Sequence, residues 1–374
     1  MSTVVVIGSN SRYIRSKPGL SYSNETATWI TPTVYNNGNH NQIMGLIAVG
    51  SYYIGATNTG TIMAGTSLDA IGEGPSISET NSWFTPTGIT SNTNTSGAVI
   101  LISGLYRYTL PGDPNTVLES GAVFTNQEND ALLYVDPANV LVTQTTSPET
   151  IASYSGSQYI IYYPLWNVPT ADSVLYSCRY IPLPYEPDSD ADPLWIACGR
   201  KDAQHGGIWW SKDQITWTEL PLPEAFTDRT VFDVTLVVYS GGDAGPPDHR
   251  LYFSCWGVIL NVTFFPNSGV GAWGSSQELV TPYAQPDLYR IISNTSNELL
   301  AVASGGIFFS ADGVNWTRFS KRGYQFRGAA WNNDTWTVGS ESLLQTNQTW
   351  TSTDGVTWTG NTTYVNAQDV TVVG

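Results

Sequence analysis

The chain has 374 residues, of which 35 are glycine, 14 are tryptophan and 21 are tyrosine, and only 12% are charged. This composition is typical of many short strands joined by tight turns, and no stretch has convincing helical periodicity, so we expect an all-β protein. The 15 Lys and Arg residues against 31 Asp and Glu give a formal charge of -16, which repels phosphate backbones and anionic lipids and excludes nucleic acid and membrane surfaces as expected partners.

The first residues carry no targeting signal that we can identify. The segment Met1 to Gly8 lacks a basic stretch followed by a long apolar run, and nowhere do 18 apolar residues follow one another. We therefore expect neither a secretion signal nor a membrane span. Cys178, Cys198 and Cys255 are too few for a disulfide framework, which indicates folding in a reducing cytoplasm.

A strand that ends in a small residue recurs along the chain. Its copies are Val4–Gly8, Tyr52–Ala56, Leu194–Cys198, Leu251–Cys255, Leu299–Ala303 and Thr335–Gly339. Cys198 and Cys255 occupy the position that glycine or alanine holds elsewhere, so we expect them to fill space where neighbouring sheets pack closely. Between Asn115 and Ala171 the sequence predicts plain strands without a clean turn motif.

A turn motif, Ser-x-Asp-Gly-x-x-Trp, follows several of these strands. Its copies comprise Ser23 and Trp29; Ser211, Asp213 and Trp217; Ser310, Asp312, Gly313 and Trp316; and Ser352, Asp354, Gly355 and Trp358. The Ser and Asp side chains can bond turn amides, glycine accepts a positive φ, and the indole can fill the space between sheets. These duties are structural.

The spacing of the tryptophans predicts a closed ring. Trp273, Trp316 and Trp358 are 43 and 42 residues apart, and the distance from Trp358 around to Trp29 fits one further unit. The segment Tyr364–Gly374 is expected to pair with the strand that begins at Thr3, which removes open sheet edges. We predict one β-propeller domain over residues 1–374 with four-stranded antiparallel blades, seven in number, with eight as the close alternative.

These motif copies with their preceding apolar strands resemble the Asp-box, or sialidase-type, propeller repeat over nearly the whole chain. The resemblance implies the propeller fold. It implies little about function, because related repeats occur in sialidases, glycan-binding proteins, photosystem II assembly factors and structural proteins of bacteriophages. The copies here have one residue fewer between Asp and Trp than the sialidase form.

A sialidase needs three convergent arginines, a tyrosine activated by a glutamate, and an aspartate as acid and base. The sequence offers no arginine-isoleucine-proline signature. Its arginines include the scattered residues Arg12, Arg15, Arg107, Arg179, Arg200, Arg250 and Arg290. We therefore expect no catalytic residues and no cofactor.

One acidic run is a weak candidate for calcium. Asp188, Asp190 and Asp192 place carboxylates at alternate positions, but the glycine of a calcium loop is missing and Pro193 ends the run, so a solvated loop is the alternative. His40, His205 and His249 have no partner in the sequence and are expected to be exposed loop residues.

Two long loops, Pro184–Gly207 and Ser240–Arg250, are candidates for ligand contacts. Tyr185, Trp195 and Tyr252 lie in or beside them, and their rings are candidates for stacking on sugars. The alternative is that Trp195 and Tyr252 fill the core.

The leading interpretation is a non-enzymatic structural or binding module of a bacteriophage particle, as a tail, fibre or outer-surface decoration. Its partners would be other virion proteins, copies of itself, or a host-surface glycan, and it would be made in the bacterial cytoplasm. One alternative is a bacterial assembly or scaffold propeller in the cytoplasm that resembles the photosystem II assembly factors. The other is a sialidase-like glycosidase.

Overall fold

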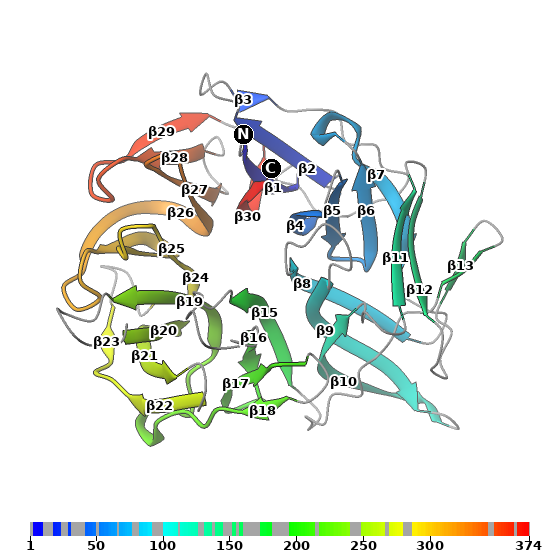
Figure 1. The fold of residues 1–374 in the computed structure, drawn as a ribbon, viewed down its shortest axis with the longest axis horizontal. Helices are drawn as coiled ribbons and strands as arrows, with labels where there is room; N and C mark the ends of the chain where they lie inside the picture. The colour runs from blue at the N-terminus through cyan, green and yellow to red at the C-terminus, as the bar shows by residue number, and fades with distance from the viewer. Residues whose placement is uncertain are drawn as a thin grey trace, which may run out of the picture.

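The computed structural model describes residues 3–9, 18–23, 29–30, 42–49, 52–65, 67–76, 82–91, 100–110, 113–125, 131–136, 139–144, 152–154, 157–159, 173–181, 194–213, 217–239, 248–265, 269–279, 286–342, 348–362 and 365–373. These residues form antiparallel strands and two short 3-10 helices, and the sheets follow one another around a ring (Figure 1). In the described part of the chain no helix is long and apolar enough to cross a membrane.

The first sheet joins the two ends of the chain, in the order β3-β2-β1-β30. Its strands are β1 (Thr3–Ser9), β2 (Pro18–Ser23), β3 (Trp29–Ile30) and β30 (Asn366–Val373). Thr3 lies opposite Val373 and Val6 opposite Val370, and the N and C labels of Figure 1 are neighbours. The predicted pairing of the two terminal strands is therefore confirmed.

The next two sheets continue around the ring. They contain β4 (Ile43–Val49), β5 (Tyr52–Thr57), β6 (Thr61–Gly65) and β7 (Gly72–Ser76), with η1 (Leu68–Ala70) between β6 and β7, and then β8 (Ser82–Ser91), β9 (Ile100–Leu110) and β10 (Asp113–Thr125). Two further hairpins follow, β11 (Ala131–Asp136) with β12 (Asn139–Gln144) and β13 (Ala152–Tyr154) with β14 (Ser157–Tyr159). β12 contacts β6 and β7, and Figure 1 places these hairpins outside the ring of sheets.

Two more sheets precede the C-terminal part. One is β15 (Val174–Ile181), β16 (Leu194–Arg200), β17 (Gly206–Ser211) and β18 (Thr218–Glu219); η2 (Glu224–Phe226) leads to β19 (Val231–Tyr239), β20 (Asp248–Cys255), β21 (Val258–Phe265), β22 (Gly269–Trp273) and β23 (Gln277–Glu278). β22 and β23 both pair with β21, one beside each end of it.

A six-stranded sheet contains two successive repeats joined by one strand. It is β24 (Leu288–Ser293), β25 (Leu299–Ser310), β26 (Thr317–Asn332), β27 (Thr335–Ser342), β28 (Gln348–Ser352) and β29 (Thr359–Thr362). Thr317 to Ser320 of β26 pair with β25, and Tyr324 to Asn332 pair with β27. β26 is thus the outer strand of one repeat and the inner strand of the next.

The inner strands form a closed cycle around the axis of the ring. β4 contacts β8, and the contacts continue through β15, β19, β24, β26 and β30 back to β4. Each of these seven described strands skips one residue in its pairing, which is a β-bulge. We call the skipped residues the bulge ring: Met44, Thr87, Tyr176, Phe232, Tyr289, Arg327 and Gln368.

The hydrophobic core lies between adjacent sheets. Cys198 and Cys255 are fully buried in one such cluster with Phe253, which confirms the predicted filling of close-packed positions. Trp316 packs between the sheets of β20 and β25, as predicted for the indole of the motif, which was expected to fill the space between sheets. The prediction for His249 was wrong: it lies in β20 with 2% exposure, because its strand turns that side chain into the core.

Candidate functional site

The motif turns are held by their own side chains. Asp312 Oδ1 accepts hydrogen bonds from the backbone N–H groups of Val314 at 2.8 Å and Asn315 at 2.7 Å, while Ser310 Oγ accepts from Gly313 N at 2.8 Å. Gly313 has φ +74°, a conformation that favours glycine. The hydrogen bonds from Asn315 and Val314 lower the pKa of Asp312, so its carboxylate is committed to the turn.

The copy at Ser352, Asp354 and Gly355 repeats this geometry, with Gly355 at φ +71° and the Trp358 indole donating to the Gly355 carbonyl at 3.1 Å. Ser211 donates to Asp213 at 2.9 Å in a third copy, and Trp217 packs on the neighbouring core cluster. Ser23 in β2 pairs with Trp29 in β3. These turns act in the architecture and offer no free catalytic group.

Two of the three rings proposed for sugar stacking are buried. Trp195 has 0% exposure and Tyr252 has 2%, with the Tyr252 hydroxyl 2.8 Å from that of Tyr239. They fill the core, which was the alternative interpretation. Four candidates lie outside the described residues: Tyr185 and the calcium candidates Asp188, Asp190 and Asp192. The described residues contain no group of three metal-ligating side chains.

A pocket lies on the axis of the ring. Its volume is about 270 Å³, and it is lined from every one of the seven inner strands, including the whole bulge ring. We call this the axial pocket. A bulge turns the extra side chain away from the regular alternation of its strand. The equivalent bulges therefore direct seven side chains from distant parts of the sequence to one place.

A buried carboxylate organises one wall of the axial pocket. Asp233 is 1% exposed and accepts hydrogen bonds from Arg179 Nε at 2.8 Å, Arg179 Nη2 at 3.0 Å and Ser177 Oγ at 2.7 Å. Burial opposes the charge of Arg179, but the attraction and hydrogen bonds of Asp233 outweigh it and raise the pKa of the guanidinium. Asp233 also accepts from the Ile291 backbone N–H at 3.3 Å, so it ties β15, β19 and β24 together.

A second ion pair reaches the strand that closes the ring. Arg290 Nη2 on β24 lies 3.2 Å from Asp369 Oδ1 on β30, and Arg290 Nε lies 3.5 Å from Asp233 Oδ2 without a hydrogen bond. The Arg290 side chain is 15% exposed. Burial raises the pKa of Asp369 to about 7, against the opposing attraction of Arg179.

Aromatic rings from successive bulges form a continuous shelf. The centroids of Tyr176 and Phe232 are 5.2 Å apart, those of Phe232 and Tyr289 are 5.8 Å apart, and the Arg327 guanidinium lies 4.0 Å from the Tyr289 ring. Burial raises the pKa of Tyr289. Cys178 also lines the axial pocket, and burial raises the pKa of its thiol to about 11. Neither group is therefore ionised as a nucleophile near neutral pH.

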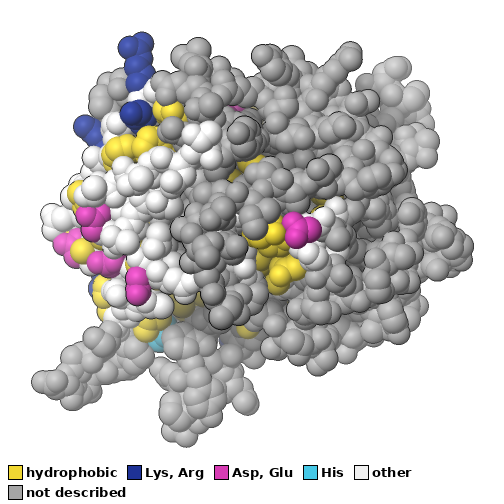
Figure 2. Space-filling model, turned by 90° about the horizontal axis from the view of Figure 1, so that it is seen from above, with side chains coloured by type: hydrophobic (Ala, Val, Ile, Leu, Met, Phe, Trp, Pro, Cys, Tyr) yellow, Lys and Arg dark blue, Asp and Glu magenta, His cyan; other side chains and the backbone are white. Residues whose placement is uncertain are grey.

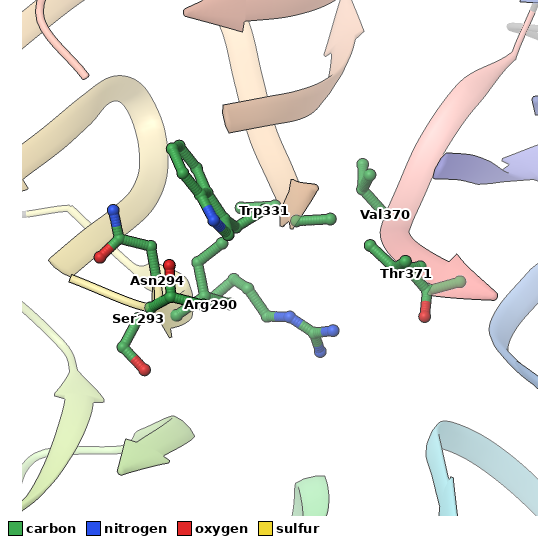
Figure 3. Close-up of a pocket in the computed structure, with 11 residues that line it drawn as sticks. Arg290, Ser293, Asn294, Trp331, Val370 and Thr371 are labelled. Atoms are coloured by element: carbon green, nitrogen blue, oxygen red, sulfur yellow. The ribbon is translucent and has the colours of Figure 1, made fainter. Parts of the chain in front are cut away.

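A second pocket of about 410 Å³ lies on β24, β26 and β30 and shares Arg290 with the axial pocket; we call it the mouth. Its lining combines the part-exposed Ile292, Trp331 and Val372 with polar residues that include Thr295 and Thr371. Figure 3 shows Arg290 extending from β24 toward the open centre, with Trp331 on one side and Val370 and Thr371 opposite. Arg290 lines both pockets and so connects them.

The expectation of scattered arginines was wrong for two residues. Arg179 and Arg290 converge with Arg327 around the axial pocket. The outer surface of this acidic protein differs, since Figure 2 shows acidic side chains of described residues there. Sequence reasoning missed Arg327, Asp233 and Asp369. Their signal is positional, because each stands at or near the same bulge of an inner strand.

Comparison with known proteins identifies the fold. No protein-family model matches the chain, and no curated protein matches it. A solved protein from Lactobacillus plantarum is similar over 100% of both chains, with 10% identity and a TM-score of 0.55. With the closed ring of antiparallel sheets, this similarity gives the chain an all-β, propeller-like fold. Other similar structures are a YCF48 bound to a D1 peptide, with 12% identity, 90% and 88% coverage and a TM-score of 0.49, and Sqt1 from Chaetomium thermophilum, with 10% identity, 89% and 90% coverage and a TM-score of 0.47.

Proposed function

We propose that this protein is a non-enzymatic propeller that holds a protein partner at its mouth and axial pocket, as an assembly factor or scaffold does. The observation that carries the proposal is the convergence of three arginines and three aromatic rings on one axial pocket, beside a mouth that holds both apolar and polar side chains. Guanidinium and aromatic groups beside apolar walls are the side chains that dominate protein recognition.

The tyrosines of the axial pocket support binding over glycoside hydrolysis. No glutamate occurs among the described lining residues of this pocket to activate Tyr176 or Tyr289, and burial raises the pKa of Tyr289. Hydrolysis of a sialoside needs an activated tyrosine. The arginines are therefore assigned to binding.

We also propose that the ring has seven blades. The support is the closed cycle of seven inner strands, each with its own bulge, which gives β11 to β14 no place on the axis. The hairpins β11–β12 and β13–β14 are then an insertion at the outer side. An eighth inner strand with an equivalent bulge, found by experimental structure determination, would contradict this count.

The partner is sought by photo-crosslinking from the mouth. A photoreactive amino acid at Thr295, an exposed residue of the mouth, should crosslink a defined protein, whereas the same group at exposed Thr359 on β29 should not. The same preparation is assayed with a fluorogenic sialoside. Equal crosslinking at both positions, or turnover of the sialoside, would contradict the proposal.

The bacteriophage location and the virion partners remain predictions from composition. Capsid, portal or tail genes beside this gene would place the binding propeller on a particle. Genes for the subunits of a bacterial complex would support the assembly role in the cytoplasm instead.

A further inference from the structure

The mouth and the axial pocket differ in chemistry, and Arg290 stands at their junction. The mouth presents the apolar side chains of Ile292, Trp331 and Val372, and its floor presents the Arg290 guanidinium. A ligand that fills both must place apolar groups against the wall and a hydrogen-bond acceptor at the floor. Because guanidinium bonds to carboxylates are about twice as strong as neutral ones, an anionic acceptor suits this floor best.

Arg290 retains donors for such a group. Its Nη2 lies 3.2 Å from Asp369 Oδ1, and its buried Nε lies 3.5 Å from Asp233 Oδ2 without a hydrogen bond. The side chain is 15% exposed and its guanidinium extends toward the open centre (Figure 3), so a ligand meets the terminal Nη groups and not Nε. Asp369 competes for the same guanidinium, since its carboxylate lies 3.2 Å from Nη2.

The walls favour a peptide over a sugar. Sugars are recognised by exposed ring faces surrounded by many polar groups. Here the part-exposed Ile292, Trp331 and Val372 make an apolar wall, while Asn294 donates to Glu298 at 2.7 Å and Ser293 donates to the Leu236 carbonyl at 2.8 Å. Aliphatic peptide side chains match this surface.

We propose that the mouth binds a peptide segment whose aliphatic residues lie between β24 and β30 and whose carboxylate reaches Arg290, which makes Arg290 the specificity-determining residue. This inference rests on the proposed function and names the chemistry of its partner. The carboxylate comes from an acidic side chain or from a peptide C-terminus, and the test separates these sources.

The probes are fluorescent peptides of valine, leucine and alanine that differ in one acceptor. One carries an internal glutamate and an amidated end, one an internal glutamine and a free C-terminal carboxylate, and one glutamine with an amidated end. At least one acidic peptide should bind about tenfold or more tightly than the neutral peptide. Which acidic peptide binds identifies the source of the carboxylate. Equal binding of all three peptides, or no binding of any at millimolar concentration, would overturn the inference.

Two variants assign the effect to Arg290. Arg290→Met should remove the preference for the acidic peptide, while Arg250→Met, whose arginine pairs with Asp248 away from both pockets, should keep it. Asp369→Asn should strengthen acidic-peptide binding, because it removes the competing carboxylate. Weaker binding by Asp369→Asn, or an unchanged preference in folded Arg290→Met, would refute the assignment.

The outcomes separate this inference from the function it rests on. If Thr295 crosslinks one protein equally well in the wild type and in Arg290→Met, the binding function stands and the acidic peptide is wrong. If a glycan array gives binding that Arg290→Met abolishes, the ligand is a sugar and both the peptide and the protein partner are wrong.

Discussion

Replacing Asp233 with alanine measures how much the axial ion pairs stabilise the ring. The change leaves Arg179 without its bidentate partner and removes the acceptor of Ser177 and the Ile291 N–H, at a site where Asp233 is 1% exposed. Loss of one partner of a buried pair costs about 3–5 kcal/mol. Unfolding entropy of about 2.1 cal/mol/K per residue gives roughly 0.8 kcal/mol/K for 374 residues, so Tm should fall by about 4–6 °C.

The matched control is Asp248→Ala. Asp248 pairs with Arg250 at 2.7 Å, but the two side chains are 35% and 41% exposed. An exposed pair contributes below about 1 kcal/mol, so Tm should change by roughly 1 °C or less. Thermal unfolding followed by near-ultraviolet circular dichroism compares the two variants. The reasoning fails if Asp233→Ala costs no more than Asp248→Ala.

Three further predictions concern the turns, the pH and the ring closure. Gly313→Ala should destabilise the protein by about 1–2 kcal/mol more than Gly323→Ala. Both glycines have a positive φ, but only a Cβ added at Gly313 meets the Tyr252 hydroxyl. Equal urea midpoints for the two variants would contradict this. Burial raises the pKa of Asp369 to about 7, so the stability contributed by its proton is full below about pH 4 and is lost as the pH rises through 7. Asp369→Asn should therefore flatten the dependence of Tm on pH across this range. An unchanged slope of Tm against pH would count against this prediction. Deleting β30 exposes Val4 and Val6 of β1, whose burial alone contributes about 1.5–3 kcal/mol each, so Tm should fall by at least roughly 4 °C. An unaltered melting curve would contradict the ring closure.

The ring and its turns were predictable because their signals are local. The serine, aspartate and glycine of a motif copy lie within four residues, and the bonds of Asp312 to Val314 and Asn315 follow from that spacing. The pairing of β1 with β30 followed from the tryptophan spacing around the ring. Each of these inferences needed only short segments and a repeat length.

The axial pocket was not predictable in the same way. Arg179, Arg290 and Arg327 lie in different repeats and meet only because their inner strands bulge at equivalent positions. A bulge is a matter of pairing between strands, which hydrophobic alternation alone does not reveal. His249 was misassigned for a related reason, since the Pro- and Gly-rich sequence before it concealed the start of β20.

The pairing of β1 with β30 has a practical consequence for engineering. Thr3 and Val373 face each other across one sheet, so a short linker would join the present ends without crossing the axis. New ends opened between the exposed residues Asn333 and Asp334, outside the motif turns, would give a circularly permuted chain with the same neighbours around each inner strand. Such a permutant moves the covalent break away from Asp369 and leaves Arg290 in place.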